Sequence, residues 1–288
     1  MKLVTTTGGL TERFGDLKSL EIIKNAGFDG YDYALYYIIN PDNDLYGSKA
    51  EDYIKRMKEK SEELNLPCTQ AHAPFPSKTE GEMFEGIVKS MKLSAYLGAE
   101  AIIVHPICAP SGTYFASRDE IFKENIKLYR ALIPYAKEYG IKVSLENLYG
   151  FDKNRNVRMT NTCSHADEYI KYLDELNSEY VTACIDIGHC AIVSNNPSDM
   201  IRQMGCRIGA LHVHDVDYVN DNHTLPYHAK LNWDEICKSL ADIAYKGDFT
   251  FEAGSFYSIY MDDDFIPVAT KYMHDVGRSL IKKIESFK

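Results

Sequence analysis

The sequence predicts an α/β protein, a single (β/α)8 TIM barrel that spans residues 1–288. Short apolar runs alternate eight times with helical patterns, and parallel strands need such crossover segments between them. A chain of 288 residues is also long enough to hold eight strand–helix units in one domain. A doubly wound open sheet is the alternative fold. It is disfavoured because no glycine-rich dinucleotide motif follows the first strand.

Eight strands are expected, each a short apolar run followed by turn or helix signals. In chain order they cover residues 3–7, 29–35, 68–73, 101–105, 142–147, 181–187, 208–212 and 249–253. The expected helices cover residues 16–25, 50–64, 82–97, 119–139, 165–176, 198–204, 233–244 and 268–287. Gly27, Gly98 and Gly140 follow three of these helices, where a glycine often ends the last turn.

Composition narrows the class of protein. No apolar run approaches the roughly 20 residues that span a bilayer, and the first residues lack a secretory apolar segment. Seven cysteines without a Cys-x-x-Cys pair, among them Cys184, Cys206 and Cys237, indicate reduced, buried thiols and a cytoplasmic location. The net charge of −10 disfavours nucleic acid and anionic membranes as partners.

Six successive predicted strands, the third to the eighth, end in side chains that bind metals or move protons. In strand order, the third to fifth strands end in His72, His105 and Glu146, and the sixth ends in Asp186, with His189 three residues on. The seventh ends in His212 and His214, with Asp221 and His223 in the following loop, and the eighth ends in Glu252. Active sites of (β/α)8 barrels lie at the C-terminal ends of the strands. The sequence therefore predicts that these side chains meet at one rim of the barrel.

Each of these residues also has an ordinary structural role open to it. His105 precedes a proline and could be a hydrogen-bonded core histidine, and Asp186 could cap the next helix. Independent caps would not all fall at one rim, so the coincidence favours a metal site. Mixed imidazole and carboxylate ligands suit a divalent ion such as zinc, manganese or cobalt.

The pattern resembles the xylose-isomerase-like TIM-barrel superfamily, which contains sugar isomerases and epimerases and the zinc-dependent apurinic/apyrimidinic (AP) endonucleases. In its ketose 3-epimerase branch, four residues at the ends of strands five to eight hold one divalent metal. Those positions match Glu146, Asp186, His212 and Glu252. An Asp-x-x-His motif that starts at Asp186 is similar too and implies that His189 lies beside the substrate. Whether His212 or His214 is the ligand stays open, and the arginine expected shortly after the strand-seven histidine is absent.

The endonuclease branch is an alternative. Its trinuclear site uses nine residues, matched in type by His72, His105, Glu146, Asp186, His189, His212, Asp221, His223 and Glu252. The surrounding motifs differ, because Cys-Ala-Ile-Val-Ser-Asn follows His189 and Val-His-Asp-Val follows His212. The loop after the second strand is also acidic, where an enzyme that binds DNA needs positive charge.

The resemblance implies a metal-dependent sugar or sugar-phosphate isomerase or epimerase that transfers a proton next to a carbonyl. Glu146 and Glu252 are the expected acid/base pair, and His189 would orient or protonate a substrate oxygen. The five aromatic residues Tyr33, Tyr36, Tyr37, Phe75 and Trp233 either stack on the sugar or belong to the core. The expected partner is a small-molecule sugar or sugar phosphate, and whether the chain forms a homo-oligomer stays open.

Overall fold

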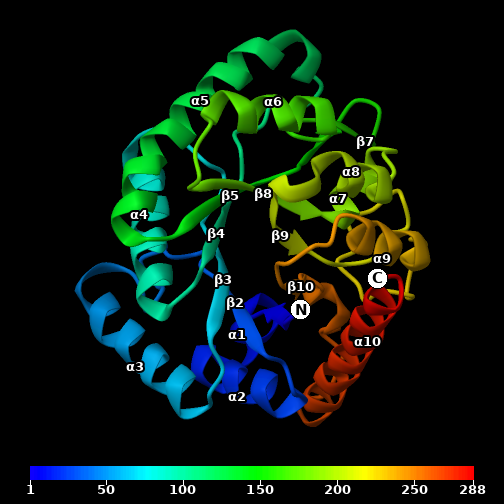
Figure 1. Ribbon diagram of the computed structural model, residues 1–288. Helices are drawn as coiled ribbons and strands as arrows, with labels where there is room; N and C mark the ends of the chain where they lie inside the picture. Colours follow the sequence, from blue (N-terminus) through cyan, green and yellow to red (C-terminus); the bar gives the residue numbers. More distant parts are fainter.

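Eight parallel strands form the inner ring of the molecule, and helices surround them (Figure 1). The computed structural model describes residues 1–288, except for the side chain of residue 48. The ring consists of β1 (Leu3–Thr6), β2 (Gly30–Ala34), β3 (Cys68–His72), β4 (Ala101–Val104), β5 (Lys142–Glu146), β8 (Val181–Asp186), β9 (Ile208–His212) and β10 (Phe249–Phe251). A parallel bridge between Val213 and Phe251 joins the last two strands. The predicted (β/α)8 barrel is therefore confirmed.

The helices follow the strands in the expected alternation. They are α1 (Gly8–Phe14), α2 (Asp16–Ala26), α3 (Ala50–Glu63), α4 (Gly81–Leu97), α5 (Tyr114–Tyr139), α6 (Ala166–Leu176), α7 (Ile187–Ile192), α8 (Pro197–Met204), α9 (Trp233–Asp242) and α10 (Ile266–Ser286). Gly27, Gly98 and Gly140 end α2, α4 and α5 in the left-handed conformation, as predicted. In the described part of the chain, no helix is long and apolar enough to span a bilayer.

Three features differ from the sequence-based expectation. The loop after β5 contains an antiparallel hairpin of β6 (Tyr149–Asp152) and β7 (Val157–Thr160). The short helices α1 and α7 were not predicted, because each has too few residues to show a helical period. Helix α5 also begins at Tyr114, five residues earlier than expected, since the buried Tyr114 belongs to its first turn.

The structure decides two side-chain positions that the sequence left open and corrects a third. Tyr33 and Trp233 are core residues, because the Tyr33 hydroxyl donates to Asp16 and the Trp233 indole donates to Asp215. Neither lines the cavity at the barrel mouth. Cys206 is exposed, whereas Cys184 and Cys237 are buried as expected. Cys206 lies in a 3₁₀ turn that joins α8 to β9, outside the core.

The long loop between β9 and α9 is organised by one fully buried carboxylate, Asp215. Its oxygens accept from five N–H groups: the backbone amides of Val216, Ala229, Lys230 and Leu231, and the indole of Trp233, at 2.9–3.3 Å. These bonds tie the two ends of the loop together. The loop carries two of the candidate site residues, Asp221 and His223. The Asp215 network therefore sets where these two residues can lie.

Replacement of Asp215 by alanine should destabilise the protein by about 3 kcal/mol, because several buried donors would lose their acceptor. The matched control is Asp217→Ala in the same loop, whose carboxylate accepts only from exposed backbone amides and one exposed side chain. That change should cost less than about 1 kcal/mol. Urea unfolding measures both. Equal losses for the two variants would contradict the role given to Asp215.

Candidate functional site

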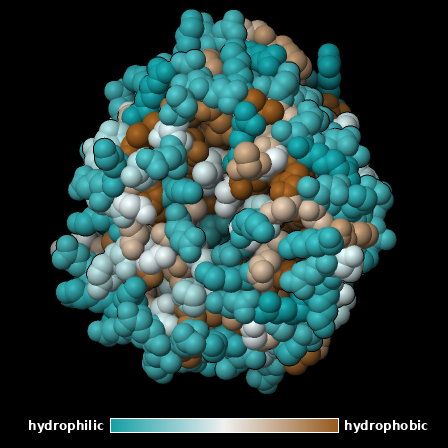
Figure 2. Space-filling model, viewed as in Figure 1, coloured by the Kyte–Doolittle hydropathy of each residue, from teal (hydrophilic) through white to brown (hydrophobic). Residues whose placement is uncertain are grey.

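The strand ends converge on one cavity of about 680 Å³ at the barrel mouth. Its lining includes His72, His105, Glu146, His189, Asp221, His223 and Glu252 from the predicted set, together with Tyr36, Tyr37, Phe75, Tyr149 and Phe151. Figure 2 shows the molecule from the side of Figure 1, with a hollow near its centre and a mostly hydrophilic outer surface. The structure therefore brings side chains from six strand ends to one place.

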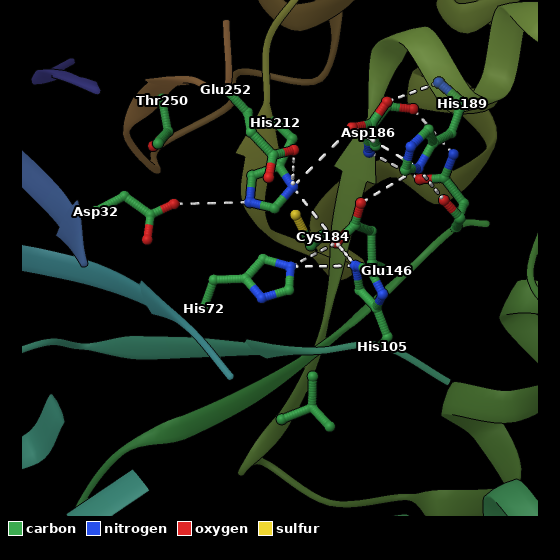
Figure 3. Close-up of polar contacts among 12 residues, drawn as sticks. Asp32, His72, His105, Glu146, Cys184, Asp186, His189, His212, Thr250 and Glu252 are labelled. Carbon is green, nitrogen blue, oxygen red and sulfur yellow. Dashed lines mark hydrogen bonds and ion pairs between the residues drawn. The ribbon is translucent and has the colours of Figure 1, made fainter. Parts of the chain in front are cut away.

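Glu146, the last residue of β5, lies at the centre of the cluster (Figure 3). Nitrogen atoms of four histidine rings lie 3.2–3.5 Å from its two carboxylate oxygens: His72, His105, His189 and His212. The carboxylate is 1% exposed, yet neither oxygen makes a hydrogen bond. Burial of an unpaired carboxylate is costly, so this site requires a cationic partner.

One group of four potential metal ligands consists of Glu146, Asp186, His212 and Glu252. Their ligand atoms all lie within 4.8 Å of one another. His212 Nδ1 is 3.0 Å from a Glu252 oxygen and 3.4 Å from a Glu146 oxygen, and it makes no hydrogen bond. A smaller group, His72, Glu146 and His212, shares two of these residues. Buried donor atoms without partners are what a divalent cation needs, so the donor set fits such an ion.

A second group consists of His189, His214, Asp221 and His223. An Asp221 oxygen lies 3.0 Å from His223 Nε2 and 3.4 Å from His189 Nε2. The rings of His214 and His223 stack at 4.0 Å between centroids. His214 Nε2 is 3.0 Å from both Asp186 oxygens. His212 and His214, which the sequence could not tell apart, therefore lie in different ligand groups that meet at Asp186.

Asp186 is held by the backbone geometry at the end of β8. Its own side chain accepts from the His189 amide at 2.6 Å and so caps α7, which is the ordinary structural role that the sequence left open. The side chain of Asn147 brackets it by donating to the Asp186 carbonyl and accepting from the Asp186 amide, at 2.9 and 2.8 Å. Asp186 is thus a helix cap and a candidate ligand at once.

The charges of the cluster shift the pKa values of its members. Burial alone would raise the pKa of the Glu146 carboxyl, but the charges of His212 and His105 hold that pKa well below its usual value. Burial would lower the pKa of His223, but the hydrogen bond with Asp221 and the charge of Glu252 raise it to about 9. Protons on His189, His212 and His223 thus balance the carboxylates, and metal binding would displace such protons.

Several residues of this region were not expected from the sequence. Tyr149 lines the cavity and its hydroxyl donates to Asp221 at 3.1 Å, while Phe151 lines the cavity beside it. Their alternation with Gly150 is the period of a strand and was a signal that could have revealed the hairpin. Asp32 was also missed: it is buried in β2, with one oxygen 3.7 Å from His212 Nε2.

Gly188, the second residue of α7, leaves the space that His214 occupies. A Cβ atom at this position would lie 2.1 Å from a carbon of the His214 ring. Alanine normally stabilises a helix relative to glycine by up to about 1 kcal/mol. Here Gly188→Ala should instead destabilise by about 1–3 kcal/mol, because the buried ring must move.

A double-mutant cycle measured by urea unfolding tests the origin of this effect. In a His214→Ala background, Gly188→Ala should lose most of its cost, since the clashing ring is gone. An unchanged cost in that background would show that His214 is not what the glycine accommodates.

Comparison with known proteins finds similarity to sugar 3-epimerases in sequence and in fold. It is 31% identical to a D-psicose 3-epimerase of Enterocloster bolteae over 127 residues, which are 44% of this chain and 38% of that enzyme. Its fold matches a D-tagatose 3-epimerase-like protein with a TM-score of 0.77 at 19% identity, over 99% of both chains. It also matches a D-allulose 3-epimerase from Methylomonas sp., in complex with D-allulose, with a TM-score of 0.74 at 18% identity, over 100% of this chain and 97% of that one.

Residues 20–264 match the family described as the xylose isomerase-like TIM barrel. This match covers most of the chain and all the residues of the two ligand groups. The chain therefore belongs to the xylose isomerase-like TIM-barrel family.

Proposed function

We propose that the protein is a metal-dependent sugar epimerase or isomerase that acts by proton transfer next to a carbonyl. The observation that carries this proposal is that carboxylate oxygens of Glu146 and Glu252 lie 3.4 and 3.0 Å from the same atom, His212 Nδ1. The two carboxylates come from β5 and from the residue after β10, and both line the one cavity. The similarity to 3-epimerases over part of the sequence and over the whole fold supports the same reaction class.

Glu146, Asp186, His212 and Glu252 would hold the divalent cation, and zinc, manganese and cobalt suit this donor set. A bound cation would polarise the sugar carbonyl and its neighbouring hydroxyl, which lowers the cost of removing the proton between them. His189 lies beside this group, with Nδ1 3.0 Å from the Asn147 carbonyl and 3.2 Å from a Glu146 oxygen. Its position suits contact with a substrate oxygen.

Glu146 and Glu252 would exchange the proton with the substrate. They reach the cavity from strands on different parts of the ring, separated by β8 and β9 on the shorter path. Two carboxylates placed this way can address opposite faces of one carbon, which an epimerisation requires. The Tyr36 hydroxyl donates to Glu252 Oε1 at 3.1 Å and thereby orients this carboxylate.

The cavity lining favours an uncharged sugar over a sugar phosphate. Among the described residues that line it there are four carboxylates, Glu12, Glu146, Asp221 and Glu252, and no lysine or arginine. A phosphate would meet these carboxylates with no lysine or arginine of the lining to offset them. The aromatic rings of Tyr36, Tyr37, Phe75, Tyr149 and Phe151 instead offer apolar faces to a sugar ring.

Incubation with ketoses in deuterated water tests the proton transfer directly. Deuterium should enter the carbon next to the carbonyl in wild-type protein loaded with metal. Glu146→Gln and Glu252→Gln should each lower the exchange rate by about 10²–10⁴-fold, since the acid/base group is lost while the side-chain size is kept.

The matched control is Glu168→Gln, a buried carboxylate outside the cavity that bonds Tyr114, Arg118 and the Cys163 amide. This variant should keep the exchange rate. Exchange that persists in both cavity variants would contradict the assignment. Faster conversion of sugar phosphates than of free ketoses would contradict the inferred substrate charge.

Phosphodiester hydrolysis at an abasic site in DNA is a second candidate function. One observation favours it: eight of the nine residues that match the endonuclease set belong to the potential ligand groups at the barrel mouth, and the ninth, His105, lies 3.2 Å from a Glu146 oxygen. The acidic cavity lining opposes it, because DNA binding depends on phosphate contacts with lysine and arginine.

Metal analysis separates the two functions. After gentle purification the sugar enzyme should contain about one divalent ion per chain, whereas the nuclease should contain about three. A value near three together with metal-dependent cleavage of abasic DNA would replace the epimerase proposal. A value near one with deuterium exchange into a ketose would exclude the nuclease.

A further inference from the structure

Asp32 is a buried carboxylate beneath the candidate metal centre that the proposed reaction does not use. It lies in the middle of β2, is 1% exposed and makes one side-chain hydrogen bond, from Gln70 Nε2 at 2.9 Å. Its Oδ1 atom has no partner. A role confined to packing against Gln70 would be served by an amide or apolar side chain at lower cost, so the presence of a carboxyl group here needs another reason.

The second observation is the orientation of the His212 ring between two sets of carboxylates (Figure 3). Nδ1 faces the cavity, 3.0 Å from Glu252 and 3.4 Å from Glu146. Nε2 faces the barrel interior, 3.7 Å from Asp32 Oδ2. Both ring nitrogens are buried without a hydrogen bond. Cys184 lies beside the ring as well, but a thiol is only a weak acceptor.

The position of Asp32 is fixed by its own neighbours. Gln70 of β3 pairs with Asp32 in register and donates its amide to Oδ2. The Thr250 hydroxyl of β10 in turn donates to Gln70 Oε1 at 3.5 Å. The three residues form a chain from β10 through β3 to β2 that ends at the His212 ring.

We propose that Asp32 is a positioning residue for His212: it accepts the Nε2–H of the ring and so directs the Nδ1 lone pair at the cation. A neutral imidazole carries one proton, and its ligand nitrogen is free only when the other nitrogen holds that proton. The present 3.7 Å separation closes to a hydrogen bond with a shift of less than about 1 Å. This inference rests on the proposed function, in which His212 binds the metal.

The first test measures the affinity of metal-free protein for zinc and manganese by chelator competition. Asp32→Asn should weaken binding by about 10–100-fold, the usual effect of losing such a partner of a metal-bound histidine. The control is Asp16→Asn, which removes a buried carboxylate that accepts from Tyr33, Tyr53 and Thr11 at the outer side of the sheet. This control should lose stability but keep its metal affinity.

The second test observes the protonation of the His212 ring directly. Nitrogen-15 NMR of histidine-labelled wild-type protein, loaded with zinc, should show His212 protonated at Nε2 and metal-bound at Nδ1. Gln70→Met should shift the His212 signal and weaken metal binding less than Asp32→Asn does, because the carboxylate stays but is no longer fixed. These signatures would not change if Asp32 served folding alone.

The results distinguish this inference from the proposed function. One outcome keeps the metal site but refutes the role of Asp32. In it, wild-type protein binds metal, Glu146→Gln abolishes binding, and the metal affinity of Asp32→Asn stays within twofold of wild type. Metal bound at His212 Nε2 would also refute the role of Asp32. If wild-type protein binds no metal, the proposed function and this inference both fail.

Discussion

The burial of the Glu146 carboxylate without a hydrogen bond is the constraint on which the rest of the site depends. A charge in this position costs several kcal/mol unless a cation compensates it. Protons on His189 and His212, whose pKa values the nearby carboxylates raise, supply that compensation, and a metal ion bound to the same carboxylate would replace it. Each ring comes from a different strand end, so the compensation exists only when the whole barrel is folded.

The parallel ring of strands satisfies this constraint through its register. Glu146 pairs with Cys184 across β5 and β8, and Asp186 pairs with His212 across β8 and β9, so neighbouring strands deliver their last side chains at similar heights. Asp221 and His223 lie beyond the barrel strands. Their loop is folded back by an isolated bridge between Asp215 and Thr224 and by the five N–H groups that donate to the Asp215 carboxylate.

Features that depend on local pattern were predictable from the sequence, and features that depend on distant partners were not. Each barrel strand was located within a few residues because a buried parallel strand is a short apolar run, and Glu146 ends β5 as expected. The hairpin of β6 and β7 was missed because it is half-exposed and rich in turn residues. Asp32 was missed because its partner, His212, lies 180 residues away in the chain. Asp215 was missed because its partner Trp233 lies at the other end of a long loop.

The types of the ligand residues do not distinguish a sugar enzyme from a nuclease, because the same histidines and carboxylates suit both. The surrounding lining supports the proposed sugar enzyme over the nuclease. A phosphodiester substrate is negatively charged, and the four carboxylates that line this cavity oppose it. A neutral polyol has hydroxyl groups that both donate and accept, so the histidines and carboxylates can bind it directly. Under the proposed function, the rings of Tyr36, Phe75 and Tyr149 would cover its apolar faces, so the lining would select the substrate and the strand ends would select the metal.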